Sequence, residues 1–90
     1  MVTIDKAALQ AEVARLEARL IDLAQEVDED LALLREARCE RAAIVDGEMA
    51  GDPGIAWTNE ERAQAAYDAS VERYQAAYWE HWQATDELRD

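Results

Sequence analysis

Apolar side chains in the first half of the chain recur at alternating steps of four and three residues. The positions are Leu9, Val13, Leu16, Leu20, Leu23 and Val27. This is the heptad pattern by which one helix packs along another in a coiled coil. We therefore predict one long amphipathic helix over about 3–46, with Thr3 as its N-cap and these six positions as its seam.

Beyond Val27 the same frame meets a polar residue. Asp30 takes the next seam position, whereas Leu31 offers an apolar side chain one position later. Either the register shifts here, as it does at a coiled-coil stutter, or Asp30 is a buried polar residue that fixes the register. The sequence leaves both alternatives open.

The second half of the chain carries a similar stripe that is rich in aromatic residues. Steps of four and three join Tyr67, Val71, Tyr74, Tyr78, His81, Thr85 and Leu88. Thr58 and Glu61 have the spacing of a capping box, which marks a helix start. We therefore predict a second helix over about 58–89, with Tyr74 and Tyr78 on its seam.

Glycine and proline are confined to one short segment between these two stripes. All three glycines and the only proline lie in GEMAGDPG, residues 47–54. Such residues end helices and form turns, and Gly47 is the expected stop of the first helix. We predict an all-α fold, an antiparallel helical hairpin that forms a single domain over 1–90 with a loop over about 47–57. A loop midpoint near Asp52 places Leu23 level with His81, and Arg38 level with Tyr67.

A hairpin of this size buries only a thin core. Ninety residues give a small domain, and the first predicted helix is longer than the second, so that Leu9 and Val13 lie on an uncovered overhang. Association with a second hairpin would cover both this overhang and the remaining apolar surface. We therefore expect a homo-oligomer, with a homodimer that forms a four-helix bundle as the favoured state.

Three tryptophans lie off the centre of the predicted seams. Trp79 and Trp82 flank His81 in the stretch YQAAYWEHWQ, and Trp57 lies at the end of the loop. Tryptophan is prominent in the hot spots of protein interfaces. Trp79 and Trp82 either pack within the bundle or anchor another protein, and Trp57 either closes the hairpin tip or inserts into a partner. His81 is expected to be a packed residue or, as the alternative, a pH-sensitive one.

The chain is strongly acidic, with a formal net charge of -12 at pH 7. This charge excludes direct attraction to nucleic acid or to an anionic membrane, and it favours a protein partner with a basic surface. The alternative is that the acidic rods imitate nucleic-acid phosphates and inhibit a DNA- or RNA-binding protein, as some phage and bacterial counter-defence proteins do. The acidic residues expected to carry that mimicry are Glu26, Asp28, Glu29, Asp68 and Glu72.

Catalytic chemistry has little support in the sequence. Ser70 and His81 are the only serine and histidine, and eleven residues of one helix separate them by about 16 Å. The pairs Glu26-x-x-Glu29 and Glu87-x-x-Asp90 resemble, in pattern only, the acidic motifs of all-helical magnesium-dependent nucleotide pyrophosphohydrolases. Such pairs arise easily in an acidic chain and are expected to be solvated. We expect no catalytic, cofactor-binding or metal-binding residues.

Cysteine usage and apolar runs indicate the compartment. Cys39 is the only cysteine, which excludes an internal disulfide and fits a reducing environment. The chain has no apolar run near the roughly 18 residues of a membrane span and no signal-like N-terminus. We expect a soluble, cytoplasmic, non-enzymatic coiled-coil module that docks another protein through an aromatic surface on its second helix.

Overall fold

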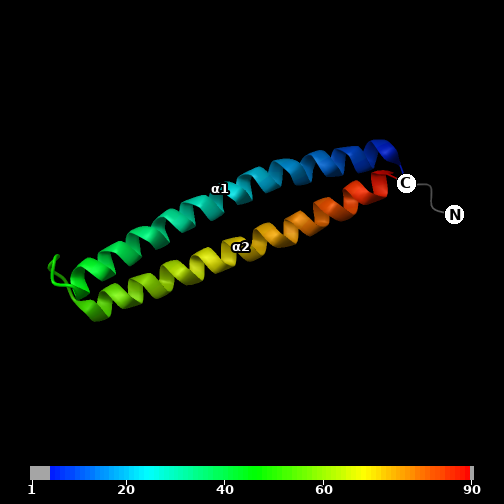
Figure 1. The fold of residues 1–90 in the computed structure, drawn as a ribbon. Helices are drawn as coiled ribbons and strands as arrows, with labels where there is room; N and C mark the ends of the chain where they lie inside the picture. Colours follow the sequence, from blue (N-terminus) through cyan, green and yellow to red (C-terminus); the bar gives the residue numbers. More distant parts are fainter. Residues whose placement is uncertain (1–4, 90) are drawn as a thin grey trace.

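The fold is an antiparallel pair of long helices. A computed structural model describes residues 5–89, in which α1 comprises Lys6–Val45 and α2 comprises Pro53–Arg89 (Figure 1). The molecule is a rod of 68 × 18 × 14 Å. Its length follows from the 40 residues of α1, since a rise of 1.5 Å per residue makes that helix about 60 Å long. The predicted all-α hairpin is confirmed.

Capping residues account for both ends of α1. The Oδ1 atom of Asp5 accepts a hydrogen bond from the backbone N–H of Ala7 at 3.0 Å, so Asp5 is the N-cap. The predicted cap, Thr3, lies outside the described residues. At the other end Gly47 adopts a positive φ of 79°, and the N–H of Glu48 donates to the carbonyl of Ala43 at 2.8 Å. This is the glycine stop that the sequence predicts.

The second helix begins at Pro53, five residues before the predicted start at Thr58. Asp52 is its cap, because its Oδ1 accepts from the N–H of Gly54 at 2.7 Å and that of Ile55 at 3.4 Å. Thr58 instead donates its hydroxyl to the carbonyl of Gly54 from inside the helix. The prediction was wrong because Pro53 was treated as a helix breaker. In the first turn, proline has a suitable φ and its missing N–H needs no partner.

This earlier start also changes the register between the helices. Arg38 donates a hydrogen bond to Gln64 at 2.7 Å, about one turn from the predicted neighbour Tyr67. The Nε2 atom of His81 lies 3.4 Å from Glu17, about two turns from the predicted Leu23. The loop is shorter and is centred earlier in the chain than predicted, so every residue of α2 faces an earlier residue of α1.

The predicted overhang of α1 is absent. The two helices contain 40 and 37 residues, and Leu9 near the start of α1 and Leu88 near the end of α2 are both half-buried. Figure 1 shows the start of α1 and the end of α2 side by side. The hairpin therefore covers its own length, which removes one of the two reasons for expecting a dimer.

The seam of α1 follows the predicted frame along the whole helix. Leu16, Leu23 and Leu34 are buried, and the other predicted seam positions are half-buried, namely Leu9, Val13, Leu20 and Val27. Asp30 and Leu31 are both half-buried. Since Leu34 keeps the original frame, the helix passes Asp30 without a shift of register.

The seam of α2 combines a row of small residues with a half-buried row that includes the predicted Tyr74. Residues seven apart form the row of small residues, namely Ala56, Ala63, Ser70, Ala77 and Ala84, all of which are buried except the half-buried Ala63. Tyr74 is half-buried beside it, whereas Tyr78 is 47% exposed and is not part of the seam between α1 and α2. Small side chains leave room for the leucines of α1, whereas bulky rings fit better at the edge. A role for Tyr78 in a seam between two hairpins stays a prediction.

Candidate protein-binding surface

The two broad faces of the hairpin differ in chemistry. In each helix, the residues that directly follow a seam residue in the sequence lie along one edge of the seam. In this antiparallel pair those edges of α1 and α2 are on the same side of the hairpin, as the hydrogen bond between Arg38 and Gln64 shows. We call this side the apolar face. The free end is the end of the rod opposite the loop. Uncharged members of this face from that end to just beyond the middle of the rod include Ile21, Ala24, Leu31, Val71, Gln75, Tyr78 and Trp82.

The opposite side is the charged face. It consists of the residues that directly precede a seam residue, and the ion pair between Arg73 and Glu26, at 3.7 Å, joins the two helices there. The heptad positions place further charged residues beside them, namely Glu12, Arg19, Glu40, Glu80 and Glu87. Leu33, which is 57% exposed, is the one large apolar side chain that the described residues of α1 contribute to these rows.

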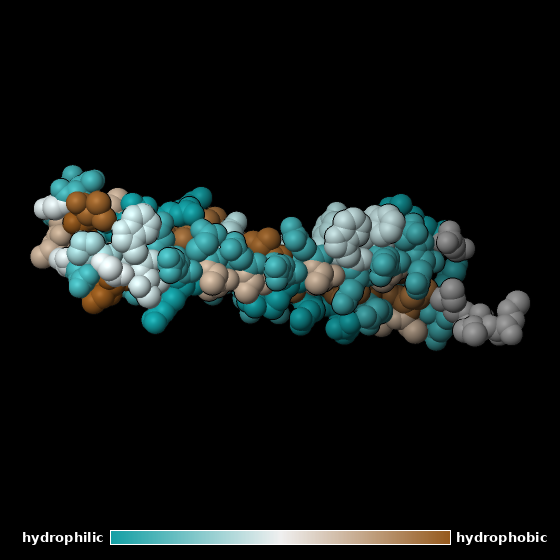
Figure 2. All heavy atoms as spheres, turned by 90° about the horizontal axis from the view of Figure 1, so that it is seen from below, coloured by the Kyte–Doolittle hydropathy of each residue, from teal (hydrophilic) through white to brown (hydrophobic). Residues whose placement is uncertain are grey.

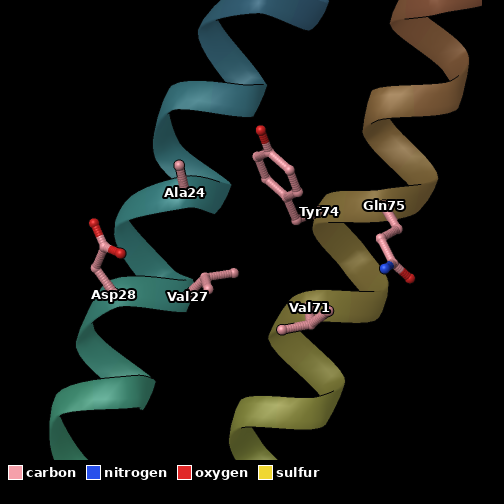
Figure 3. Close-up of a pocket in the computed structure, with 6 residues that line it drawn as sticks. All are labelled: Ala24, Val27, Asp28, Val71, Tyr74 and Gln75. Carbon is pink, nitrogen blue, oxygen red and sulfur yellow. The ribbon is translucent and has the colours of Figure 1, made fainter.

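A shallow hollow lies near the middle of the apolar face. It has a volume of about 270 Å³ and is lined by Ala24, Val27, Asp28, Val71, Tyr74 and Gln75. In Figure 3, Val27 and Val71 point toward each other from the two helices, and the ring of Tyr74 stands between the helices. The half-buried valines leave an apolar floor, while Asp28 and Gln75 border it. Sequence analysis missed this hollow, although the rows beside the seam carry its signal.

Exposed aromatic rings extend from this face around α2. Tyr78 and Trp79 meet edge to face with ring centroids 6.0 Å apart, and Trp79 meets Trp82 in the same way at 6.0 Å. Tyr78, Trp79 and Trp82 are 47%, 59% and 51% exposed. We call these three residues the aromatic cluster. These edge-to-face contacts join the three rings into one exposed aromatic surface on α2.

Trp57 makes a different contact at the hairpin tip. The guanidinium of Arg41 lies 4.3 Å from the centroid of its ring, a cation–π distance. The nearby apolar residues Val45 and Ile55 are 50% and 63% exposed, and Trp57 itself is 48% exposed. Figure 2 shows large pale side chains standing out of a hydrophilic surface near each end of the rod. The tip is thus a second exposed apolar region.

An ion pair fastens the tip behind Trp57. Arg41 Nε donates to Glu60 Oε2 at 2.8 Å, and Arg38 Nε lies 3.4 Å from Glu60 Oε1. The hydrogen bond from Arg41 lowers the pKa of the half-buried Glu60 below its ordinary value of 4.5. Glu60 thus joins these two arginines of α1 to the first turns of α2.

This pair gives a testable pH dependence. A lowered pKa in the folded state means that the ionised carboxylate stabilises the fold above pH 4.5, and that this stabilisation is lost as the pH falls through the lowered value. Glu60→Gln should therefore lower the melting temperature at pH 7, and its difference from the wild type should shrink toward pH 3. The exposed neighbour Glu61→Gln serves as the control. Equal effects of the two substitutions at pH 7 would contradict the prediction.

The five acidic residues proposed for mimicry do not form one patch. Glu26 lies on the charged face beside Arg73, and the exposed Glu29 lies on the same side. Asp28 borders the hollow, and Asp68 accepts a hydrogen bond from Gln64 at 3.0 Å on the apolar side. Glu72 is exposed on the outside of α2. Negative charge is therefore distributed around the rod.

Chemically reactive side chains are scattered. The hydroxyl of Ser70 is buried in the seam and donates to the carbonyl of Tyr67, and Cys39 is exposed. No group of three or more His, Cys, Asp or Glu residues between positions 5 and 89 is arranged to hold a metal ion. Asp90, of the second acidic pair, lies outside the described residues. Neither helix contains a stretch long and apolar enough to cross a membrane.

Comparisons with known proteins place no constraint on function. No protein family, no curated protein and no solved structure matches this chain. The functional argument accordingly starts from the apolar face and the aromatic cluster.

Proposed function

We propose that this protein is a non-enzymatic interaction module, a helical hairpin that docks another protein through its apolar face and aromatic cluster. The observation that carries the proposal is the aromatic cluster, three adjoining rings that are each about half exposed. Contiguous exposed apolar surface is typical of interaction sites, and tryptophan and tyrosine are enriched in interface hot spots.

These rings lie outside the buried core of the hairpin. The buried residues of the hairpin are leucines on α1 and alanines with Ser70 on α2, whereas the aromatic cluster lies outside the seam. A ring that is half exposed leaves apolar surface in water, which favours aggregation unless a partner covers it. The cluster is therefore better explained by binding than by stability.

Substitution of the cluster should separate binding from folding. Trp79→Ala and Trp82→Ala should each weaken partner binding by roughly tenfold or more, as hot-spot truncations do, while the melting temperature stays close to that of the wild type. Site-specific photo-cross-linking from position 82 should yield a discrete product with another protein. Position 33 on the charged face is the control. Equal cross-linking from both positions, or none from position 82, would contradict the proposal.

A second copy of the chain is another candidate occupant of the apolar face. The hollow lies close to the midpoints of both α1 and α2. A two-fold axis through it would place the two halves of the face against each other and would produce the four-helix bundle that the sequence predicts.

Mimicry of nucleic acid is a second candidate function. The net charge of -12 on a rod only 18 × 14 Å in cross-section supports it, because acidic side chains lie on both broad faces. Mimicry requires binding that weakens steeply with salt and is lost when Glu26, Asp28, Glu29, Asp68 and Glu72 are neutralised. Docking through the aromatic cluster requires weaker salt dependence and sensitivity to Trp79 and Trp82.

A further inference from the structure

We infer that the apolar face binds a basic amphipathic helix of its partner, which lies over the hollow as a third helix. This inference rests on the proposed function and specifies the chemistry of the partner. It draws on three features of the described residues, namely the shape of the hollow, the sign of the charges around it, and the position of Asp28.

The shape of the face fits a helix. The two antiparallel helices lie side by side with a shallow groove between them, and Val27, Val71 and Tyr74 form its floor (Figure 3). Ile21, which is 63% exposed, stands toward the free end of the same face, and half-buried Leu31 stands toward the tip. Ten residues of α1 separate these two, which is about 15 Å or nearly three helical turns. An apolar stripe of that length on a partner helix would cover them.

The charges along this stretch are all negative. Between positions 14 and 31 of α1 and between positions 68 and 85 of α2, the charged residues of the apolar face are Glu17, Asp28 and Asp68. Arg35 and Arg38 lie nearer the tip, and Arg38 is engaged by Gln64 and Glu60. Basic side chains that flank the stripe of a partner helix would therefore meet acids, whereas acidic side chains would be repelled.

The same charges disfavour a second copy as the occupant. Each copy carries a net charge of -12, and Asp28 lines the hollow itself. A two-fold axis through the hollow would bring two Asp28 carboxylates into one poorly solvated region, where like charges repel. A basic helix instead supplies a counter-charge to Asp28. Electrostatic complementarity therefore favours the basic helix over self-association.

Three synthetic peptides test this inference on the intact chain. Each is an amphipathic helix of about 20 residues with the same leucine and alanine stripe, and they differ only in flanking residues, which are lysine, glutamine or glutamate. Binding is measured by the fluorescence of the exposed tryptophans and by calorimetry at low and high salt. We expect the lysine peptide to bind most tightly, at least tenfold more tightly than the glutamine peptide at low salt, with this advantage reduced at high salt.

Paired variants locate the binding site. Ile21→Ser should weaken binding of the lysine peptide about tenfold, as loss of an interface anchor does, whereas Leu33→Ser, on the charged face with similar exposure, should not. Asp28→Asn should reduce the preference for lysine over glutamine, whereas Glu29→Gln should leave it unchanged. All four side chains are exposed, and only Asp28 lines the hollow. We therefore expect each variant to fold like the wild type.

The outcomes separate this inference from the proposed function. Equal binding of all three peptides, lost in Ile21→Ser, would keep the apolar face as a docking surface and overturn its preference for a basic helix. If Leu33→Ser and Glu29→Gln weakened binding of the lysine peptide as much as Ile21→Ser and Asp28→Asn do, the binding would be nonspecific attraction to an acidic rod. That outcome would overturn the proposed site. A dimer in light scattering that Ile21→Ser dissociates, with no peptide bound, would assign the face to a second copy. No peptide binding by a stable monomer would overturn the inference and the docking proposal together.

Discussion

Leu34→Ala is expected to destabilise the hairpin by about 2–5 kcal/mol, whereas Leu33→Ala, at the neighbouring position, should change stability by less than about 0.5 kcal/mol. The two leucines differ in burial, since Leu34 is 2% exposed and Leu33 is 57% exposed. Truncating Leu34 removes apolar contacts and leaves a cavity between two rods that have few other buried residues. The same truncation at Leu33 removes a side chain that water already contacts.

Urea unfolding followed by circular dichroism measures this difference. A small domain has a total free energy of unfolding of about 5–15 kcal/mol, so the Leu34→Ala variant should lose a large part of its stability at room temperature. Leu33→Ala is matched in residue type, helix and sequence position, which removes helix propensity as an explanation. Similar midpoints for the two variants would show that the seam of α1 does not follow the frame through Leu16, Leu23 and Leu34.

Ala77→Leu is expected to destabilise the hairpin by about 1–3 kcal/mol, while Ala76→Leu should be nearly neutral. Ala77 is 4% exposed in the row of small residues that faces α1, and Ala76 is exposed. Leucine at position 77 must displace the helices from each other or adopt a strained rotamer. At position 76 it points to solvent, and its helix propensity is close to that of alanine.

The substitutions of Ala77 and Ala76 by leucine also test which row of α2 packs most closely against α1. Thermal unfolding of Ala77→Leu and Ala76→Leu can be compared with that of Tyr78→Ala, because Tyr78 was one of the two tyrosines predicted from the sequence to lie on the seam. If the small row is the seam, Ala77→Leu lowers the melting temperature most. A larger loss in Tyr78→Ala than in Ala77→Leu, at protein concentrations that keep the chain monomeric, would restore the tyrosine row.

The sequence indicated the fold because helix signals are local. The heptad spacing of Leu9 to Val27 and the stop at Gly47 each act within a few residues, so the pattern predicted α1 and its inward face correctly. The start of α2 was misplaced because the proline signal has two meanings. Pro53 breaks a helix interior but suits a first turn, and the Asp52 cap decides between them.

One of the two rows predicted for the seam of α2, the row that contains Tyr78, lies one position away from the buried row, because bulky apolar character was taken as the guide to burial. Tyr78 and Ala77 are neighbours, and the predicted stripe was drawn through the larger, aromatic residue. Burial at a close helix contact depends on fit as well as on hydropathy, and the buried positions of α2 hold only alanine and serine. The seven-residue repeat from Ala56 to Ala84 is visible in the sequence, but only a partner of known shape shows that it faces inward.

The sequence left two alternatives open for Trp79 and Trp82, packing within a bundle or anchoring another protein. Both rings are exposed on the hairpin, and their role as anchors stays a prediction. The hollow between Val27 and Val71 was not predicted, because it depends on which residues of the two helices lie level. An error of about one to two turns in register was enough to hide it.

The sequence alone determined that this chain forms two helices joined by a turn, that its surface is acidic and that its tryptophans lie off the seam. These properties follow from local spacing, from composition and from helical periodicity. Only the tertiary structure decided the register between α1 and α2 and which row of small residues faces α1. It also decided that Ile21 of α1 and Val71 of α2 lie on the same face. Such features are set by contacts between residues distant in the chain, and those contacts depend on where the turn begins and on how closely two backbones approach.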